Sequence, residues 1–224
     1  MSSLDLLPPI PAPGKIFCLG VNYEDHASES GLTKPEFPVL FLRVPASLVA
    51  HGKAIEMPRV SASLDFEGEL VAIIGRPGKH ISVTDALSHV AGYSIFNDGS
   101  VRDYQFKTPQ WTAGKNFDRT GAFGPEFVSA DEVPPGASGL TIETRLNGVQ
   151  VQYSNTSRMI FDVANTIAIL SSMTTLEPGD VLVMGTPAGV GAARTPPLYM
   201  KEGDVVEVSI EALGTLSNFI RREP

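Results

Sequence analysis

The chain has 224 residues, of which 42% are hydrophobic and 19% are charged, which is the composition of a globular protein and not of a disordered one. The 17 Lys and Arg against 25 Asp and Glu give a net charge of −8, which argues against broad binding of nucleic acid or of an anionic membrane. The single cysteine, Cys18, excludes an internal disulfide framework and a cysteine-rich zinc site.

Residues 1–14, which are rich in proline from residue 8 onward, predict an extended arm ahead of one domain that spans residues 15–224. The arm does not show a basic start followed by a continuous apolar stretch, which a signal peptide would need. No run in the chain approaches the length of about 18 apolar residues that a membrane span requires. With no export signal and no disulfide, we expect a cytoplasmic protein.

Short apolar runs alternate with turn signals such as RPGKH, LNGVQ and KEGD, which predicts a β-rich domain with a few helices. Strands are expected at about residues 15–20, 39–43, 66–74, 91–97, 140–147, 181–184 and 205–211. Residues 22–33 predict a short polar helix or a mobile loop that ends at Gly31. Helices are expected over residues 83–89 and 157–172, the second because its apolar residues recur at helical spacing.

The stretch LDFEGELVAIIG, residues 64–75, alternates carboxylates with other residues before it becomes apolar. Positions two apart share a face of a strand, so Asp65, Glu67 and Glu69 point the same way, with neighbours about 7 Å apart. Like charges this close repel unless something positive lies between them. One interpretation is a solvated edge strand whose charges oppose aggregation. The other is a rigid oxygen site for a hard cation such as Mg²⁺ or Mn²⁺.

A metal site built from only two carboxylates of this strand would be short of charge and of donor atoms. The expected third ligand is Asp98, because it lies in the acidic turn that ends another apolar strand, in YSIFNDGSVRDYQ. Histidine-rich zinc ligation is not indicated, since the 4 histidines are nowhere paired at ligand spacing.

The order of several segments carries a family resemblance: CLGVNYEDHASESG, LDFEGELVAIIG, VAGYSIFNDGSVRDYQ, WTAGKNFD, GPEFV, TRLNGVQVQ and LEPGDVLVMGTPAGVG. This set resembles the fumarylacetoacetate hydrolase family in its short, catalytic-domain form, from about Lys15 to Phe219. The resemblance implies an α+β, β-rich fold, a mixed β-roll or barrel-like sandwich with a few short helices, usually as a homodimer. It also implies a Mg²⁺ or Mn²⁺ ion held by Glu67, Glu69 and Asp98. Asp65 would then lie outside the ligand set or at the surface, orienting a water or a basic side chain.

The same resemblance assigns catalytic roles to three residues. A 2-oxo acid can chelate the metal through its carboxylate and keto oxygens, and Lys115 of GKNFD would add positive charge where an enolate develops. His26 and Glu29 match a pair in which the glutamate orients the imidazole so that it deprotonates water. The segment around them would order as a lid when substrate binds. The alternatives are an ordinary surface lysine and an exposed histidine in a polar loop.

Substrate contacts are expected from the residues that follow Asp98 and from the GTP motif. Arg102 and Gln105 match substrate-contacting positions in related enzymes, and a guanidinium suits a second substrate carboxylate. Alternatively, Arg102 pairs structurally with Asp103 or another acid. Thr186 can offer its hydroxyl and its backbone N–H to the substrate carboxylate.

Tyr23 is expected to contact the substrate and, like Trp111, to form a wall of the pocket, with core or interface packing as the alternative for both. Arg43 stands where many relatives of the family have lysine, and the two cations are not interchangeable. This difference bears on substrate identity more than on metal binding.

These observations favour a Mg²⁺-dependent hydrolase of an acylpyruvate or related 2,4-dioxo acid, which would release pyruvate or a close 2-oxo acid plus a carboxylic acid. The main alternative is a decarboxylase or isomerase of a 2-oxo dioate, such as oxaloacetate or an intermediate of aromatic catabolism. A metal-stabilised β-module that serves only dimerisation is a third interpretation, but it would not need His26, Glu29 and Lys115.

Overall fold

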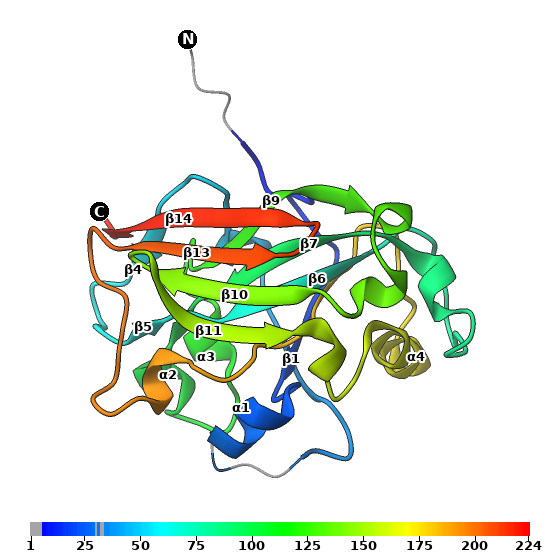
Figure 1. Cartoon of the computed structure of the whole chain (residues 1–224), viewed down its shortest axis with the longest axis horizontal. Coiled ribbons are helices and arrows are strands. Elements are labelled where there is room, and N and C mark those ends of the chain that lie inside the picture. Colours follow the sequence, from blue (N-terminus) through cyan, green and yellow to red (C-terminus); the bar gives the residue numbers. More distant parts are fainter. Residues whose placement is uncertain (1–5, 30, 32–33) are drawn as a thin grey trace.

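The computed structural model describes residues 6–29, 31 and 34–224. Two curled β-sheets pack face to face, with the helices at their margins (Figure 1). The seven-stranded sheet has the order β2 (Val39–Leu42), β1 (Ile16–Gly20), β12 (Val181–Val183), β6 (Gly68–Ile74), β7 (Val90–Asp98), β9 (Gly121–Ser129) and β3 (Leu48–Ala50). The five-stranded sheet has the order β11 (Val149–Asn155), β10 (Thr141–Leu146), β13 (Val205–Ile210), β14 (Gly214–Arg222) and β4 (Ile55–Met57).

The remaining elements are short. A two-stranded ribbon joins β5 (Leu64–Asp65) to β8 (Ser100–Val101), and the α-helices are α1 (Glu24–Glu29), α2 (Arg102–Gln105), α3 (Thr112–Lys115) and α4 (Val163–Met173). Both large sheets are mixed, because β1 pairs parallel with β12, β3 with β9 and β4 with β14, while their other pairs are antiparallel. The expected β-rich, mixed architecture with few helices is confirmed.

The position of β6 decides between the two interpretations of the acidic stretch. β6 lies in the middle of its sheet, paired antiparallel with both β12 and β7, and every residue in it is buried. The solvated edge strand is therefore wrong. The strand expected over residues 66–74 begins only at Gly68. Phe66 and Glu67 form the link between β5 and β6.

Alternate side chains along β6 pack into two different hydrophobic clusters, one on each face of the sheet. Leu70, Ala72 and Ile74 belong to the larger core between the two sheets. Val71 and Ile73 belong to a second cluster on the outer face of the seven-stranded sheet. Glu69 is in step with the second set, so its side chain points to the outer face.

Close packing of the second sheet explains why a glycine lies between Glu67 and Glu69. A Cβ on Gly68 would overlap Thr144 Oγ1 of β10, so the second sheet lies directly against this backbone. Only glycine permits such an approach. Because the glycine turns toward the second sheet, Glu67 and Glu69 on either side of it project away from that sheet.

Two helix predictions need correction. The helix expected over residues 157–172 is confirmed from Val163 onward, and it begins there because the Asp162 side chain accepts the N–H of Asn165 as an N-cap. The residues before it form only a 3₁₀ turn at Thr156–Arg158. The helix expected over residues 83–89 is likewise a single 3₁₀ turn at Ala86–His89.

The predicted arm lies partly outside the described residues, because residues 1–5 are not among them. Residues 6–14 form no helix or strand, and Ile10 packs on the outer-face cluster. The division into an arm and one domain thus stays a prediction. None of the helices in the described part of the chain is long and apolar enough to cross a membrane.

Candidate active site

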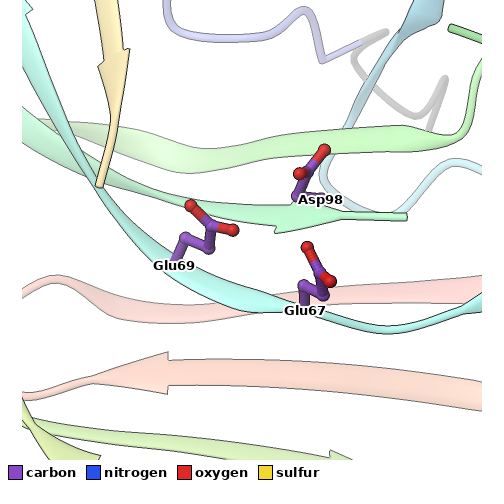
Figure 2. A group of neighbouring side chains, drawn as sticks. All are labelled: Glu67, Glu69 and Asp98. Atoms are coloured by element: carbon purple, nitrogen blue, oxygen red, sulfur yellow. The ribbon is translucent and has the colours of Figure 1, made fainter. Parts of the chain in front are cut away.

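Glu67, Glu69 and Asp98 form a buried acidic cluster. One carboxylate oxygen of each lies within 4.8 Å of the others, and Figure 2 shows the three side chains converging from two adjacent segments. The pairing of β6 with β7 produces this arrangement, because Gly68 is opposite Asn97 and the Asp98 N–H donates to Glu67 O at 2.8 Å. The predicted grouping of these three residues is found in the structure.

Three cations neutralise most of this cluster. Lys115 Nζ lies 2.6 Å from both Glu67 Oε2 and Asp98 Oδ2, and Arg102 Nη2 lies 2.7 Å from Glu67 Oε1. Arg43 pairs with the other oxygen of Asp98. Lys115 is 1% exposed, so it is not an ordinary surface lysine. These cations supply the positive charge that the closely spaced carboxylates require.

The cations change the acidity of Glu67. Burial alone would raise the pKa of Glu67, but Lys115 and Arg102 outweigh burial and lower that pKa to about 2. Burial would lower the pKa of Lys115, but Asp98 and Glu67 outweigh it and raise that pKa above its ordinary value. Glu67 and Lys115 are therefore both charged in the neutral pH range.

Glu69 is in a different position. Burial, followed by the charges of Asp98 and Glu67, raises the pKa of Glu69 well above its ordinary value. The three cations contact Glu67 and Asp98, whereas the hydrogen bond to Glu69 comes from the N–H of Gly185. The cluster is thus short of positive charge beside Glu69. Three convergent carboxylates with this deficit fit a hard divalent cation.

The cluster opens into a cavity of about 480 Å³. The cavity is lined by most of the predicted site residues, namely His26, Glu29, Glu67, Glu69, Arg102, Gln105, Lys115 and Thr186, and also by Trp111. Tyr23 does not line it, although it was predicted to contact substrate. The chain turns at Val21, which has a φ of 57° and faces the cavity, so that Tyr23 lies fully buried in the core.

His26 and Glu29 face the cavity from α1. His26 Nδ1 lies 3.4 Å from Glu29 Oε2, at the long end of hydrogen-bond distances, and both Glu29 oxygens accept the N–H of Gly189 at 3.0 Å. Burial alone would raise the pKa of Glu29. The hydrogen bonds from His26 and Gly189 favour the carboxylate and outweigh burial, so the pKa of Glu29 is lowered. His26 is 8% exposed, so the exposed-histidine alternative is wrong. Of the expected lid segment, residues 30, 32 and 33 lie outside the described residues.

Thr186 is held by residues that sequence reasoning missed. Its hydroxyl donates to Gly68 O at 3.0 Å and accepts from Gln152 Nε2 at 2.8 Å. Gln152 also accepts the N–H of Gly68 at 3.0 Å, which joins the GTP motif to the start of β6. No local pattern around Gln152 distinguishes it from the other polar residues of an exposed-looking strand.

Asp65 and Arg102 pair with each other. Asp65 is fully buried and accepts from Arg102 Nε at 2.8 Å, so it lies outside the acidic cluster and orients a basic side chain, but it is not a surface residue. Arg102 therefore does pair with acids, as one alternative held. Its partners are Asp65 and Glu67, whereas Asp103 accepts from Ser61 Oγ.

The mixed β-sheets and the cavity define a β-rich enzyme scaffold in which a carboxylate cluster, a lysine and two arginines share one buried site. The chain belongs to the fumarylacetoacetate hydrolase family, because the family described as "Fumarylacetoacetate (FAA) hydrolase C-terminal" matches residues 15–221. The resemblance read from the ordered segments is thereby confirmed.

Similar proteins cover almost the whole chain. Oxaloacetate tautomerase fahd2, mitochondrial, of Xenopus laevis is 43% identical over 219 residues, which are 97% of this chain and 68% of that protein. The structure of a fumarylacetoacetate hydrolase from Exiguobacterium antarcticum has a TM-score of 0.89 at 41% identity, covering 97% of this chain and 78% of that one. A 2-hydroxyhepta-2,4-diene-1,7-dioate isomerase from Mycobacterium marinum has a TM-score of 0.84 at 38% identity, with coverages of 97% and 78%.

Proposed function

We propose that this protein is a Mg²⁺-dependent enzyme that interconverts the keto and enol forms of a 2-oxo dioate such as oxaloacetate. The observation that carries the proposal is the shared cavity, which His26 and Glu29 line together with Lys115 and the two glutamates of the acidic cluster. The names of two similar proteins, an oxaloacetate tautomerase and a diene-dioate isomerase, support the isomerase alternative. The name of the Exiguobacterium antarcticum structure, a fumarylacetoacetate hydrolase, supports hydrolysis as the second candidate.

Glu67, Glu69 and Asp98 would hold the metal, since their oxygens converge and their charge is incompletely neutralised. Mn²⁺ has the same preference for oxygen ligands and is the alternative ion. When bound, the ion would act as a Lewis acid toward the 2-oxo carbonyl group.

The cations of the chain would bind and orient the substrate. Lys115 would place its ammonium beside the oxygen that becomes negative in the enolate, where a fixed charge in a buried site is most effective. Arg102 would face a carboxylate of the dioate, and Gln105, which accepts from Arg102 Nη1 at 2.8 Å, would keep that guanidinium in place. Thr186 would contribute its backbone N–H to the same anionic end, because its hydroxyl proton is already donated to Gly68 O.

His26 would move the proton. With Nδ1–H donating to Glu29, the Nε2 atom of the neutral ring takes the proton from C3 of the keto form, and the electron pair of that C–H bond becomes the enolate. The same proton then returns to the enolate oxygen to give the enol. Glu29 stabilises the imidazolium between these two transfers, and the Gly189 N–H fixes Glu29.

Hydrolysis of an acylpyruvate is the second candidate function. A cavity of about 480 Å³ is far larger than a four-carbon acid needs. Its apolar wall includes Phe41 and Trp111, whose rings meet edge to face at 5.7 Å, and such a wall suits an acyl chain. In this reaction His26 would deprotonate a water that attacks the distal carbonyl, and the products would be pyruvate and a carboxylic acid.

A direct comparison of substrates tests the proposal. The protein with Mg²⁺ is offered oxaloacetate and a set of acylpyruvates, and enol absorbance, pyruvate and CO₂ are measured. We expect accelerated keto–enol exchange of oxaloacetate, and release of pyruvate from acylpyruvates would establish the second activity. Oxaloacetate exchange at the uncatalysed rate would refute the tautomerase assignment, and loss of CO₂ without faster exchange would identify a decarboxylase.

We also propose a homodimer, with a cytoplasmic location as a separate prediction. β2 is an edge strand of the seven-stranded sheet. Val39 and Leu42 within it are exposed, as are Phe37 before it and Val44 after it. An exposed apolar edge of this kind is a common site of pairing between chains. The name of the Xenopus laevis relative places that protein in mitochondria, so the location needs a direct test.

A further inference from the structure

Asp65 lies behind the cavity wall and joins two parts of it. Its carboxylate accepts the N–H groups of Gly191 at 2.8 Å and Ala192 at 2.9 Å, and it accepts from Arg102 Nε at 2.8 Å. Arg102 and Ala192 both line the cavity. Asp65 is fully buried, so water does not compete for these hydrogen bonds.

Two hydrogen bonds and one ion pair hold the guanidinium of Arg102. Nε donates to Asp65, Nη1 donates to Gln105 Oε1 at 2.8 Å, and Nη2 lies 2.7 Å from Glu67 Oε1. A guanidinium carries its N–H groups in a rigid planar fork. Fixing these three atoms therefore fixes the plane of the group and the direction of the N–H groups left for a ligand.

Gly191 shows how closely the loop after β12 approaches Asp65. A Cβ on Gly191 would lie 2.5 Å from Asp65 Oδ1 and would overlap the Leu198 carbonyl oxygen. A larger residue would push the two N–H donors away from the carboxylate. The glycine and the aspartate thus form one contact, although they are 126 positions apart in the sequence.

We propose that Asp65 is a positioning residue, which holds Arg102 and the Gly191–Ala192 backbone in one arrangement so that Arg102 can bind the anionic end of the substrate. The inference rests on the proposed function in so far as that ligand is a 2-oxo acid. Asp65 does not line the cavity, and it acts through the Arg102 guanidinium.

Binding of oxalate tests this role without turnover. Oxalate affinity is measured by calorimetry at a Mg²⁺ concentration shown by titration to saturate each variant. Asp65→Asn keeps the side-chain volume but removes the charge that holds Nε, so we expect the oxalate dissociation constant to rise roughly 10- to 100-fold. The matched control is Asp103→Asn, next to Arg102 but exposed and bonded to Ser61, which should bind oxalate like the wild type.

A double-mutant cycle separates positioning from a general structural effect. Arg102→Lys keeps the positive charge but loses the fork, so it should weaken oxalate binding by itself. Asp65→Asn should then add less than about twofold in the Arg102→Lys background, because the two residues act as one unit. If Asp65→Asn does not fold, Arg102→Lys alone decides, since wild-type oxalate binding in that variant would overturn the proposal.

Other outcomes would also overturn it: wild-type affinity in Asp65→Asn, a full loss from Asp65→Asn that persists beside Arg102→Lys, or no binding of oxalate by the wild type. The proposed function is decided separately, by turnover of oxaloacetate and acylpyruvates. A protein that binds oxalate through Asp65 and Arg102 yet converts neither substrate class would refute the function and leave this inference standing.

Discussion

Gly68 of β6 packs against Thr144 of β10 so closely that any side chain at position 68 would overlap the threonine hydroxyl. This contact places the acidic cluster, because it turns the glycine toward the second sheet and its two glutamate neighbours away from it. Gly68→Ala should therefore destabilise the fold by about 1–3 kcal/mol, the usual cost of overpacking a core. Denaturant unfolding measures the loss.

A second substitution identifies the cause of that loss. The buried Thr144 hydroxyl forms no hydrogen bond with the described residues, so Thr144→Ala by itself should break no hydrogen bond. In the double variant the shortest contact of the new methyl group is gone, although Val208 Cγ1 would still lie 2.9 Å from it, and we expect part of the stability to return. Strictly additive losses would show that contact with Thr144 is not the reason for the glycine.

The second prediction concerns the metal. Glu67→Gln and Glu69→Gln each remove a charge that a divalent ion needs while keeping the volume of the side chain. We expect Mg²⁺ affinity to be lost in both, whereas Glu126→Gln, at an exposed position of β9, should titrate like the wild type. Isothermal calorimetry gives the affinities, and circular dichroism checks the fold. Wild-type Mg²⁺ affinity in both cluster variants would refute the assignment of the ligands.

Sequence reasoning found the acidic cluster because its signal is local. The alternation at residues 64–75 indicates a shared face, and an acidic turn at the end of an apolar strand indicates Asp98. The counter-ions leave no such signal. Arg43 pairs with Asp98 from 55 positions away, and nothing in the sequence around Arg43 shows which acid it meets.

Two strands that the sequence did not predict, β9 and β11, also lack a clear local signal. β9 contains an internal Gly124–Pro125 pair, which reads as a turn although the strand continues through it. β11 is half polar, and its outer residues Val149 and Tyr153 are exposed, so its alternation is not the usual apolar-in pattern. Asp65 is fully buried although the sequence permits a surface position, because a strand pattern indicates which side chains share a face but not what covers that face.

Oxalate binding should depend on the metal. A planar ligand with two adjacent oxygens mimics the enolate of a 2-oxo acid, so we expect oxalate to bind in Mg²⁺ or Mn²⁺ and to lose affinity by orders of magnitude in excess chelator. Calorimetry with and without chelator measures the difference. Tight oxalate binding in chelator would show that Arg102 and Lys115 alone form the anion site.

Lys115→Met should affect both stability and activity. The substitution leaves Glu67 and Asp98 facing each other without the ammonium that lies 2.6 Å from each, so the metal-free protein should lose about 3–5 kcal/mol of unfolding free energy. Saturating Mg²⁺ should restore part of this loss, because the ion supplies charge to the same carboxylates. Every reaction that passes through an enolate should slow. Unchanged stability without metal would contradict the role of Lys115 as counter-ion.

His26 separates the reactions that need proton transfer from those that do not. If His26 takes a proton from C3 of oxaloacetate, or from water beside an acylpyruvate, His26→Gln should slow both reactions by roughly 10²- to 10⁴-fold, the usual effect of losing a general base. Decarboxylation of oxaloacetate needs charge stabilisation but no such base, so that activity should be largely retained. His80→Gln, at an exposed position, is the matched control. The decisive quantity is the ratio of exchange to CO₂ release in wild type and variant. A ratio that does not fall in His26→Gln would remove His26 and Glu29 from the mechanism and leave decarboxylation as the activity to test first.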